Sequence, residues 1–107
     1  MQIFSHCLYE FQKDIRKLVL LTLEIYELNN IINRLEKEKI PYHFQYIKDK
    51  KANLYFGDEK CVEVAKMLSK KALNELSEEE DFILGIMLGY GIKQQCSRYI
   101  NKKCVIN

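Results

Sequence analysis

Residues 76–99, LSEEEDFILGIMLGYGIKQQCSRY, are the stretch around which the rest of the chain can be organised. Ser77 and Glu80 have the spacing of a capping box, in which the serine oxygen accepts the N3 amide proton and the glutamate reaches back to the cap amide. A helix is therefore predicted to begin there. Its first turn is strongly acidic, with Glu78, Glu79, Glu80 and Asp81. We interpret these carboxylates as favourable partners of the helix dipole rather than as a metal site or catalytic site.

The residues after this turn leave almost no polar face. They are Phe82, Ile83, Leu84, Ile86, Met87 and Leu88. A helix that is apolar all round is expected to be covered on most sides, so the pattern predicts the central helix of the core. Replacing Phe82 with alanine should then cost about 3–5 kcal/mol, the usual range for a core phenylalanine.

Two glycines interrupt this helix at a spacing of four residues. Gly85 and Gly89 each cost about 1 kcal/mol relative to alanine inside a helix, which indicates a close approach to that backbone. Gly89 or Gly91 alternatively ends the helix in the left-handed conformation. A final helix is predicted over residues 92–103.

Length and composition indicate one domain, residues 1–107. A chain of 107 residues hides roughly 60–70% of its unfolded surface, which suffices for a core without metal or disulfide support. The amino terminus lacks the pattern of a secretory signal, and no apolar run is long enough to span a bilayer. We therefore expect a cytoplasmic protein with no membrane partner. A net charge of +2 does not indicate a nucleic-acid partner.

The first part of the chain leaves two structures open. Residues 2–11 alternate in polarity as a strand covered on both faces does, and residues 18–23, LVLLTL, resemble a central strand. A single long helix over residues 11–39 is the alternative, because Phe11 and Ile15 also fit helical spacing. We favour a hairpin of two strands, since so long a helix would be unusual in a small domain.

The middle of the chain has a clearer pattern of secondary structure than the first part. An amphipathic helix is predicted from Ile25 until Pro41 stops it, followed by two strands joined by a charged turn at residues 48–51. Asp58 is placed to cap a further helix with Cys61 on its apolar stripe. The resulting order, β-β-α-β-β-α-α-α, predicts an α+β domain with a small, mostly antiparallel sheet covered by helices in two layers.

Four runs of this chain resemble a small bacterial family known only as a domain of unknown function. The runs are HCLYEFQKDIRKLVLLT, INRLEKEKIPYHFQYI, NLYFG and SEEEDFILGIMLGYGIKQQCSRY. The resemblance covers nearly the whole chain and implies a compact α+β domain. It also implies a connection with flavodoxin, because family members are often encoded beside a flavodoxin or fused to one. It implies no catalytic residue. The positions of the family's signature run are occupied here by Glu79, Glu80, Asp81, Phe82, Gly85, Gly89, Tyr90, Gln95, Cys96, Arg98 and Tyr99.

The predicted last helix carries the most basic surface in the chain. Its cations are Lys93, Arg98, Lys102 and Lys103. Flavodoxins as a family are strongly acidic, so this cluster is the surface that we expect a flavodoxin partner to contact. The alternative is an ordinary solvated face.

The spacing of the cysteines does not favour a metal site or a disulfide. Cys7, Cys61, Cys96 and Cys104 are widely spaced, with no C-x-x-C pair and no histidine at finger spacing, so we expect free thiols and no cofactor. Cys61 lies near a helix start, where a thiolate is favoured, although its apolar stripe favours simple packing. A Cys–His pair would have to be assembled from distant positions, such as Cys96 with His6 or His43.

These observations favour a non-enzymatic interaction or regulatory module. The alternative is a thiol-based or metal-binding redox protein built on Cys7, Cys61 or Cys96. The sequence does not determine a biochemical activity or an oligomeric state.

Overall fold

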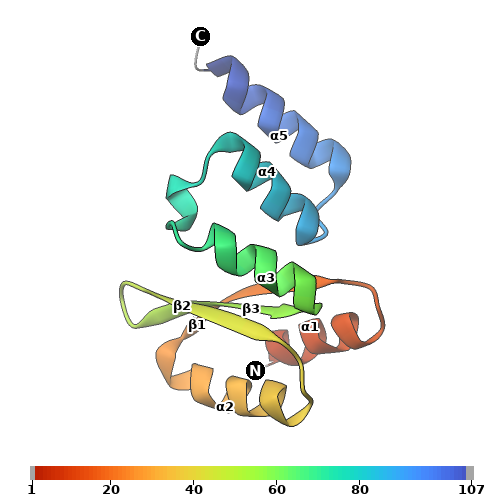
Figure 1. The fold of residues 1–107 in the computed structure, drawn as a ribbon, viewed down its shortest axis with the longest axis vertical. Coiled ribbons are helices and arrows are strands. Elements are labelled where there is room, and N and C mark those ends of the chain that lie inside the picture. Colours follow the sequence, from red (N-terminus) through yellow and green to blue (C-terminus); the bar gives the residue numbers. More distant parts are fainter. Residues whose placement is uncertain (1, 106–107) are drawn as a thin grey trace.

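The computed structural model describes residues 2–105, which are built around a three-stranded antiparallel sheet (Figure 1). The strands are β1 (Leu18–Glu24), β2 (Tyr42–Ile47) and β3 (Lys51–Gly57). β3 lies in the middle and pairs antiparallel with both other strands. β1 and β2 therefore run parallel to each other at the two edges and are not neighbours.

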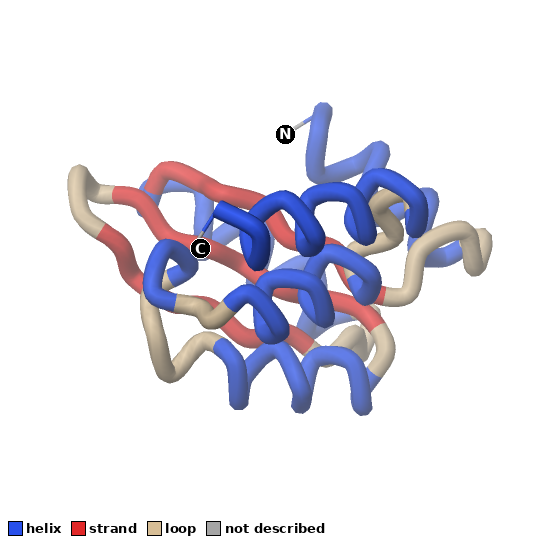
Figure 2. The backbone as a smooth tube through the Cα atoms, turned by 90° about the horizontal axis from the view of Figure 1, so that it is seen from above, coloured by secondary structure: helices blue, strands red, loops and turns tan. Residues whose placement is uncertain are grey.

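Helices cover both faces of this sheet. They are α1 (Gln2–Gln12), α2 (Ile25–Lys37), α3 (Glu59–Leu68), α4 (Glu78–Met87) and α5 (Ile92–Val105), with a short 3-10 helix, Leu73–Glu75, before α4. In Figure 1, α1 and α2 lie below the sheet, α3 lies above it, and α4 and α5 stack beyond α3. Figure 2 shows α5 and α4 lying over the sheet when the molecule is seen from above. The predicted α+β class is confirmed. The sequence predicted two layers, whereas helices cover both faces of the sheet and make a third layer (Figure 1).

The first segment is a helix and not the predicted strand. Phe4, Cys7 and Leu8 are the buried residues of α1 and recur at helical spacing. Phe4 and Phe11 place their rings edge-on against Phe56 of β3, with centroids 5.6 and 6.3 Å apart. The alternating polarity of so short a segment fitted both periods, and packing against the sheet favours the helix. The hairpin predicted for residues 2–23 was therefore wrong, although residues 18–23 do form a strand.

The local predictions for the middle of the chain are confirmed. α2 begins at Ile25, so the alternative of one long helix over residues 11–39 is excluded. The β2–β3 hairpin turns at residues 48–50, where Asp49 and Lys50 adopt left-handed φ angles of 64° and 57°. Asp58 caps α3, because its side chain accepts hydrogen bonds from the amides of Lys60 and Cys61.

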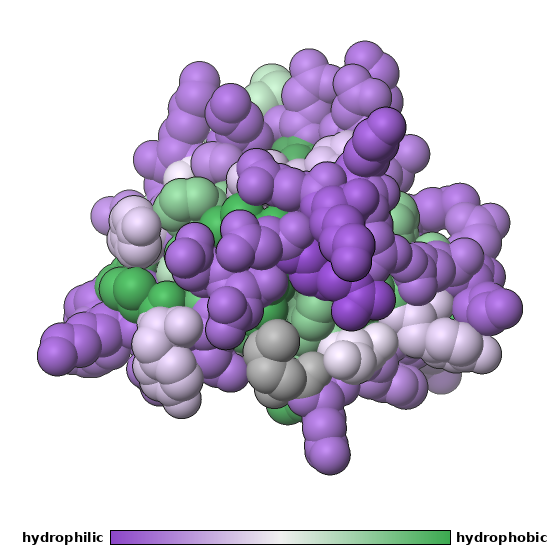
Figure 3. All heavy atoms as spheres, turned by 90° about the horizontal axis from the view of Figure 1, so that it is seen from below, coloured by the Kyte–Doolittle hydropathy of each residue, from purple (hydrophilic) through white to green (hydrophobic). Residues whose placement is uncertain are grey.

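The buried side chains divide into two clusters, one on each face of the sheet. On the lower face, the side chains under α1 and α2 are apolar, and Leu54 and Phe56 of β3 are fully buried among them. On the upper face, Tyr55 of β3 packs with Leu18, with residues of α3, and with Leu84 and Leu88. Seen from below, the outer surface of the molecule is largely hydrophilic, with smaller apolar patches (Figure 3).

The predicted central helix, α4, is peripheral. Leu84 and Leu88 are buried, but the side chain of Ile83 is 45% exposed, and Phe82 is only partly covered. The central element is β3, in which residues 52–57 are all buried. No helix among residues 2–105 is both long enough and apolar enough to cross a bilayer.

Candidate functional site

The α4–α5 hairpin is the region that brings the signature residues together, and its helix ends are as predicted. Ser77 Oγ accepts a hydrogen bond from the amide of Glu80 at 3.1 Å, and Glu80 Oε1 accepts one from the amide of Ser77 at 2.9 Å. α4 ends before Gly89, which has a left-handed φ of 83°. The capping box and the glycine terminator are thus both confirmed.

Ion pairs join the acidic first turn of α4 to the basic side of α5. Asp81 Oδ2 lies 3.0 Å from Arg98 Nε and 3.1 Å from Lys102 Nζ. The hydrogen bond from Arg98 is the main reason that the pKa of Asp81 is lowered. Three of the four predicted partner-binding cations therefore face carboxylates of the same chain, Lys103 being the third.

A second carboxylate anchors the far end of the hairpin. Glu79 Oε2 accepts hydrogen bonds at 2.7 Å from both Lys103 Nζ and the Tyr99 hydroxyl. Donation by Lys103, followed by that of Tyr99, lowers the pKa of Glu79 to about 2. Lys93, the fourth predicted cation, makes no ion pair with the residues that the structure describes. The acidic first turn of α4 therefore forms ion pairs with α5, in addition to interacting favourably with the helix dipole.

At Gly85 the backbone of α4 lies directly against a side chain of α5. A methyl group added there would overlap the side-chain amide of Gln95, which confirms the predicted close approach. Gln95 is only 7% exposed.

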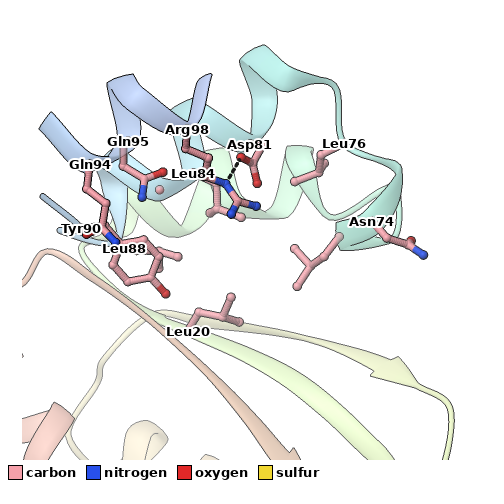
Figure 4. A pocket seen from close by; sticks show the side chains of 12 residues that line it. Leu20, Asn74, Leu76, Asp81, Leu84, Leu88, Tyr90, Gln94, Gln95 and Arg98 are labelled. Carbon is pink, nitrogen blue, oxygen red and sulfur yellow. Dashed lines mark hydrogen bonds and ion pairs between the residues drawn. The ribbon is translucent and has the colours of Figure 1, made fainter. Parts of the chain in front are cut away.

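A cavity of about 690 Å³ lies between this hairpin and the sheet (Figure 4). Its apolar wall consists mainly of leucines, with Leu20 contributed by β1 and Leu76, Leu84 and Leu88 by the region of α4. Its polar wall comes from the hairpin: Asp81, Tyr90, Gln94, Gln95 and Arg98. Sequence reasoning missed this cavity, because no local pattern predicts that β1 would lie opposite the hairpin.

A groove of about 390 Å³ lies on the other side of the hairpin. We call it the outer groove; Glu79, Phe82, Ile83, Cys96, Tyr99 and Ile100 line it. The Phe82 and Tyr99 rings pack with centroids 5.4 Å apart. Ile100 is 57% exposed at its edge. Phe82 and Ile83 of α4 are thus apolar side chains that the fold leaves partly exposed.

The signature positions divide between these two surfaces. Asp81, Gly85, Tyr90, Gln95 and Arg98 line the cavity, whereas Glu79, Phe82, Cys96 and Tyr99 line the outer groove. Glu80 and Gly89 shape the two ends of α4.

The structure assembles no Cys–His pair from the described residues. His43 Nε2 lies 3.0 Å from Ser69 Oγ, within hydrogen-bonding distance, and burial lowers the pKa of this imidazole. His6 lies near Glu10, at 3.8 Å. Cys7 is buried beside Arg16, whose Nη1 is 3.6 Å from its Sγ.

The remaining thiols are also separate from each other. Burial, followed by the neighbouring Asp58, raises the pKa of Cys61, so this helix start does not activate its thiol. Cys96 lines the outer groove, and Cys104 is exposed. Among residues 2–105, no group of three or more His, Cys, Asp or Glu side chains is arranged to hold a metal ion.

Comparison with curated proteins finds no match for this sequence. A family model described as "Protein of unknown function (DUF2023)" matches residues 2–102, which is nearly the whole chain. The family resemblance and the α+β fold are therefore consistent, and the chain belongs to the DUF2023 family.

Proposed function

We propose that this chain is a non-enzymatic interaction module whose contact surface is the outer groove of the α4–α5 hairpin, and that its partner is a flavodoxin. The observation that carries the proposal is the apolar surface left exposed on the hairpin. Ile83, Ile92 and Ile100 are 45%, 69% and 57% exposed, and contiguous exposed apolar surface commonly marks a protein-interaction site.

The flavodoxin partner is supported by the family resemblance and by the charge of α5. This helix contains four cations and no acidic residue. Lys103 remains about half exposed although it is paired with Glu79, which lines the outer groove. An acidic protein approaching α5 would therefore meet an apolar groove bordered by positive side chains.

The ion pairs change what salt should do to this complex. Because Glu79 and Asp81 already neutralise much of the charge on α5, we expect the apolar groove to supply most of the affinity. Added salt should then weaken binding only moderately, in contrast to an interface held by unpaired cations.

The test is to measure binding between the purified chain and the flavodoxin of its own host by isothermal titration calorimetry at low salt. The double variant Ile83→Ser/Ile100→Ser should weaken binding at least about tenfold, because it removes two apolar contacts. The matched control is Ile3→Ser on α1, since Ile3 is 71% exposed on the opposite side of the sheet.

The charge contribution is tested separately with Lys93→Glu. This reversal leaves the described ion pairs of the hairpin intact, whereas Lys102→Glu would also remove a partner of Asp81. We expect Lys93→Glu to slow association, with Lys39→Glu near the end of α2 as the control. Unchanged affinity in the double isoleucine variant would exclude the groove. Absence of binding at low salt would exclude the partnership.

The competing redox hypothesis receives less support from the geometry. The His43 imidazole is engaged by Ser69, and the Cys61 thiol has a raised pKa rather than a lowered one. His43 therefore contacts a hydroxyl and not a cysteine, and a raised pKa is the opposite of what a reactive thiol needs.

A further inference from the structure

We infer that the cavity between β1 and the α4–α5 hairpin is a binding site for a small apolar carboxylic acid. This site is distinct from the outer groove, because it lies on the other side of the hairpin and is lined by different residues. Its volume of about 690 Å³ lies within the range of about 300–1,000 Å³ that is typical of small-molecule pockets.

The charged groups in and around the polar wall of the cavity balance one another. Asp81 is the carboxylate on this wall, and two cations, Arg98 and Lys102, share its Oδ2 atom. The nearby Glu79 and Glu80 carboxylates are paired with Lys103 and Lys71. With Glu78 also in the first turn of α4, four carboxylates face four cations in this region, so it is close to neutral and suits a singly charged anion better than a phosphate dianion.

Arg98 is oriented to receive that anion. Its Nε donates to Asp81, and this bond holds the guanidinium in place. The two terminal nitrogens have no hydrogen-bond partner among the described residues, and Figure 4 shows them directed into the cavity above Leu20. Two parallel N–H donors of one guanidinium match the two oxygens of a carboxylate.

Gln95 provides a second, independent indication of a ligand. The residue is more than nine-tenths buried and lines the cavity, yet its side-chain amide has no hydrogen-bond partner among residues 2–105. The amide atoms of Gln95 are not among the fully buried side-chain atoms that lack a partner, so they are open to the cavity and available to hydrogen-bond a ligand. Gly85 allows this amide to lie against α4, so the backbone is shaped to keep the group at the cavity wall.

The remaining wall selects the rest of the molecule. Leu20 lies across the cavity from the polar groups, Leu84 and Leu88 lie beside those groups, and none of the three offers a donor or an acceptor (Figure 4). A ligand that fills the site therefore needs an apolar body with its carboxylate at one end, next to Arg98 and Gln95.

The experiment is a titration of the ¹⁵N-labelled chain with octanoate, followed through the side-chain amide signals of Gln95, which a Gln95→Glu variant identifies. Octanoate should shift these signals with saturation. Octanamide, which has the same apolar body without the charge, should bind at least about tenfold more weakly, because a charged hydrogen bond contributes about 1.5–3 kcal/mol. Acetate, which lacks the apolar body, should produce no saturable shift.

Two variants test the opposite walls of the cavity. Arg98→Gln should weaken octanoate binding at least about tenfold and leave octanamide unaffected. The matched control is Lys93→Gln, which removes one positive charge from α5 outside the cavity lining. Leu20→Trp fills the cavity from β1 without touching the ion pairs, and it should abolish binding while the backbone amide spectrum stays folded.

Several results would overturn the inference. Saturable binding of octanamide as tight as that of octanoate would exclude recognition of the carboxylate. Tighter binding of octyl phosphate than of octanoate would show that the anion class is wrong. Absence of any shift at Gln95, or octanoate binding that survives Leu20→Trp, would exclude the cavity.

Discussion

The two faces of the sheet are packed in different ways. Below the sheet, Val19, Leu54 and Phe56 are fully buried among apolar side chains of α1 and α2. Above it, Asn53 is buried with its Oδ1 accepting a hydrogen bond from Thr22, and the cavity opens beside Leu20. Close apolar packing stabilises a fold, whereas unfilled volume and buried polar groups reduce stability and are typical of binding sites. The lower face thus serves the fold, and the upper face is where we place ligand binding.

The largest expected effect is on the lower face. Phe56→Ala should reduce the free energy of unfolding by about 3–5 kcal/mol, because the ring is fully buried and contacts Phe4 and Phe11 edge-on. Urea denaturation followed by circular dichroism measures the change. A loss below about 1 kcal/mol would mean that this face is not the main stabilising core.

Substitutions at two glycines compare how well the backbone of the sheet and that of the hairpin tolerate an added methyl group. Gly57→Ala should cost at least about 2 kcal/mol, because the new methyl group would overlap the carbonyl oxygen of Lys17 at a φ of 150°. Gly85→Ala meets only the movable amide of Gln95, and it gains helix propensity. Its stability should therefore change by less than about 1 kcal/mol. Equal losses in the two variants would contradict this difference between the regions.

Phe82→Ala should have a smaller effect than the sequence alone suggested. The ring is only partly buried and packs mainly against Tyr99, so we expect a loss of about 1–2 kcal/mol instead of 3–5. The same denaturation experiment measures it beside Phe56→Ala. A loss as large as that of Phe56→Ala would show that α4 belongs to the main core after all.

A smaller effect is expected from the dependence of the hairpin on pH. The pKa of Glu79 is lowered to about 2 from an ordinary value of 4.5, so its carboxylate stabilises the folded hairpin above pH 4.5. This stabilisation is lost as the pH falls from 4.5 toward 2, because the Glu79 carboxylate of the folded hairpin then becomes protonated. The ring signals of Tyr99 should report the loss in nuclear magnetic resonance spectra. Glu79→Gln should remove this step, and a step that persists in this variant would assign it to another group.

A second change of stability with pH is expected from His43, which lies on the upper face of the sheet, and it occurs at a higher pH than that of Glu79. Burial, followed by the charge of Lys66, lowers the pKa of His43 below its ordinary value of 6.5. The unfolded chain therefore binds this proton more readily, and stability declines as the pH falls below 6.5. Ser69→Ala removes the hydroxyl next to His43 and tests whether this contact contributes to the pH dependence of stability.

Several elements follow from short patterns that can be read in the sequence. The capping box of Ser77 and Glu80, the cap at Asp58 and the turn before β3 each depend on residues within a few positions of one another. Gly85 was also identified correctly as a point of close approach. Local hydrogen bonds and backbone conformations determine these features, and they need no knowledge of distant neighbours.

The tertiary structure decided what such patterns leave open. α1 is a helix because Phe4 and Phe11 meet Phe56, which is far away in the sequence. Three of the cations of α5, Arg98, Lys102 and Lys103, are paired because the hairpin brings them to carboxylates of α4, and this could not be inferred from either segment alone.

The candidate ligand site depends on tertiary structure to the greatest extent. Its residues Arg98 and Gln95 belong to the signature run, but the cavity exists only because Leu20 of β1 lies opposite them. The sequence by itself determined the helices from α2 onward, the turns and the chemical groups on each segment, since these follow from interactions within a few residues. Only the tertiary structure determined which groups are buried, paired or left facing a cavity, because burial depends on the neighbours that folding brings together.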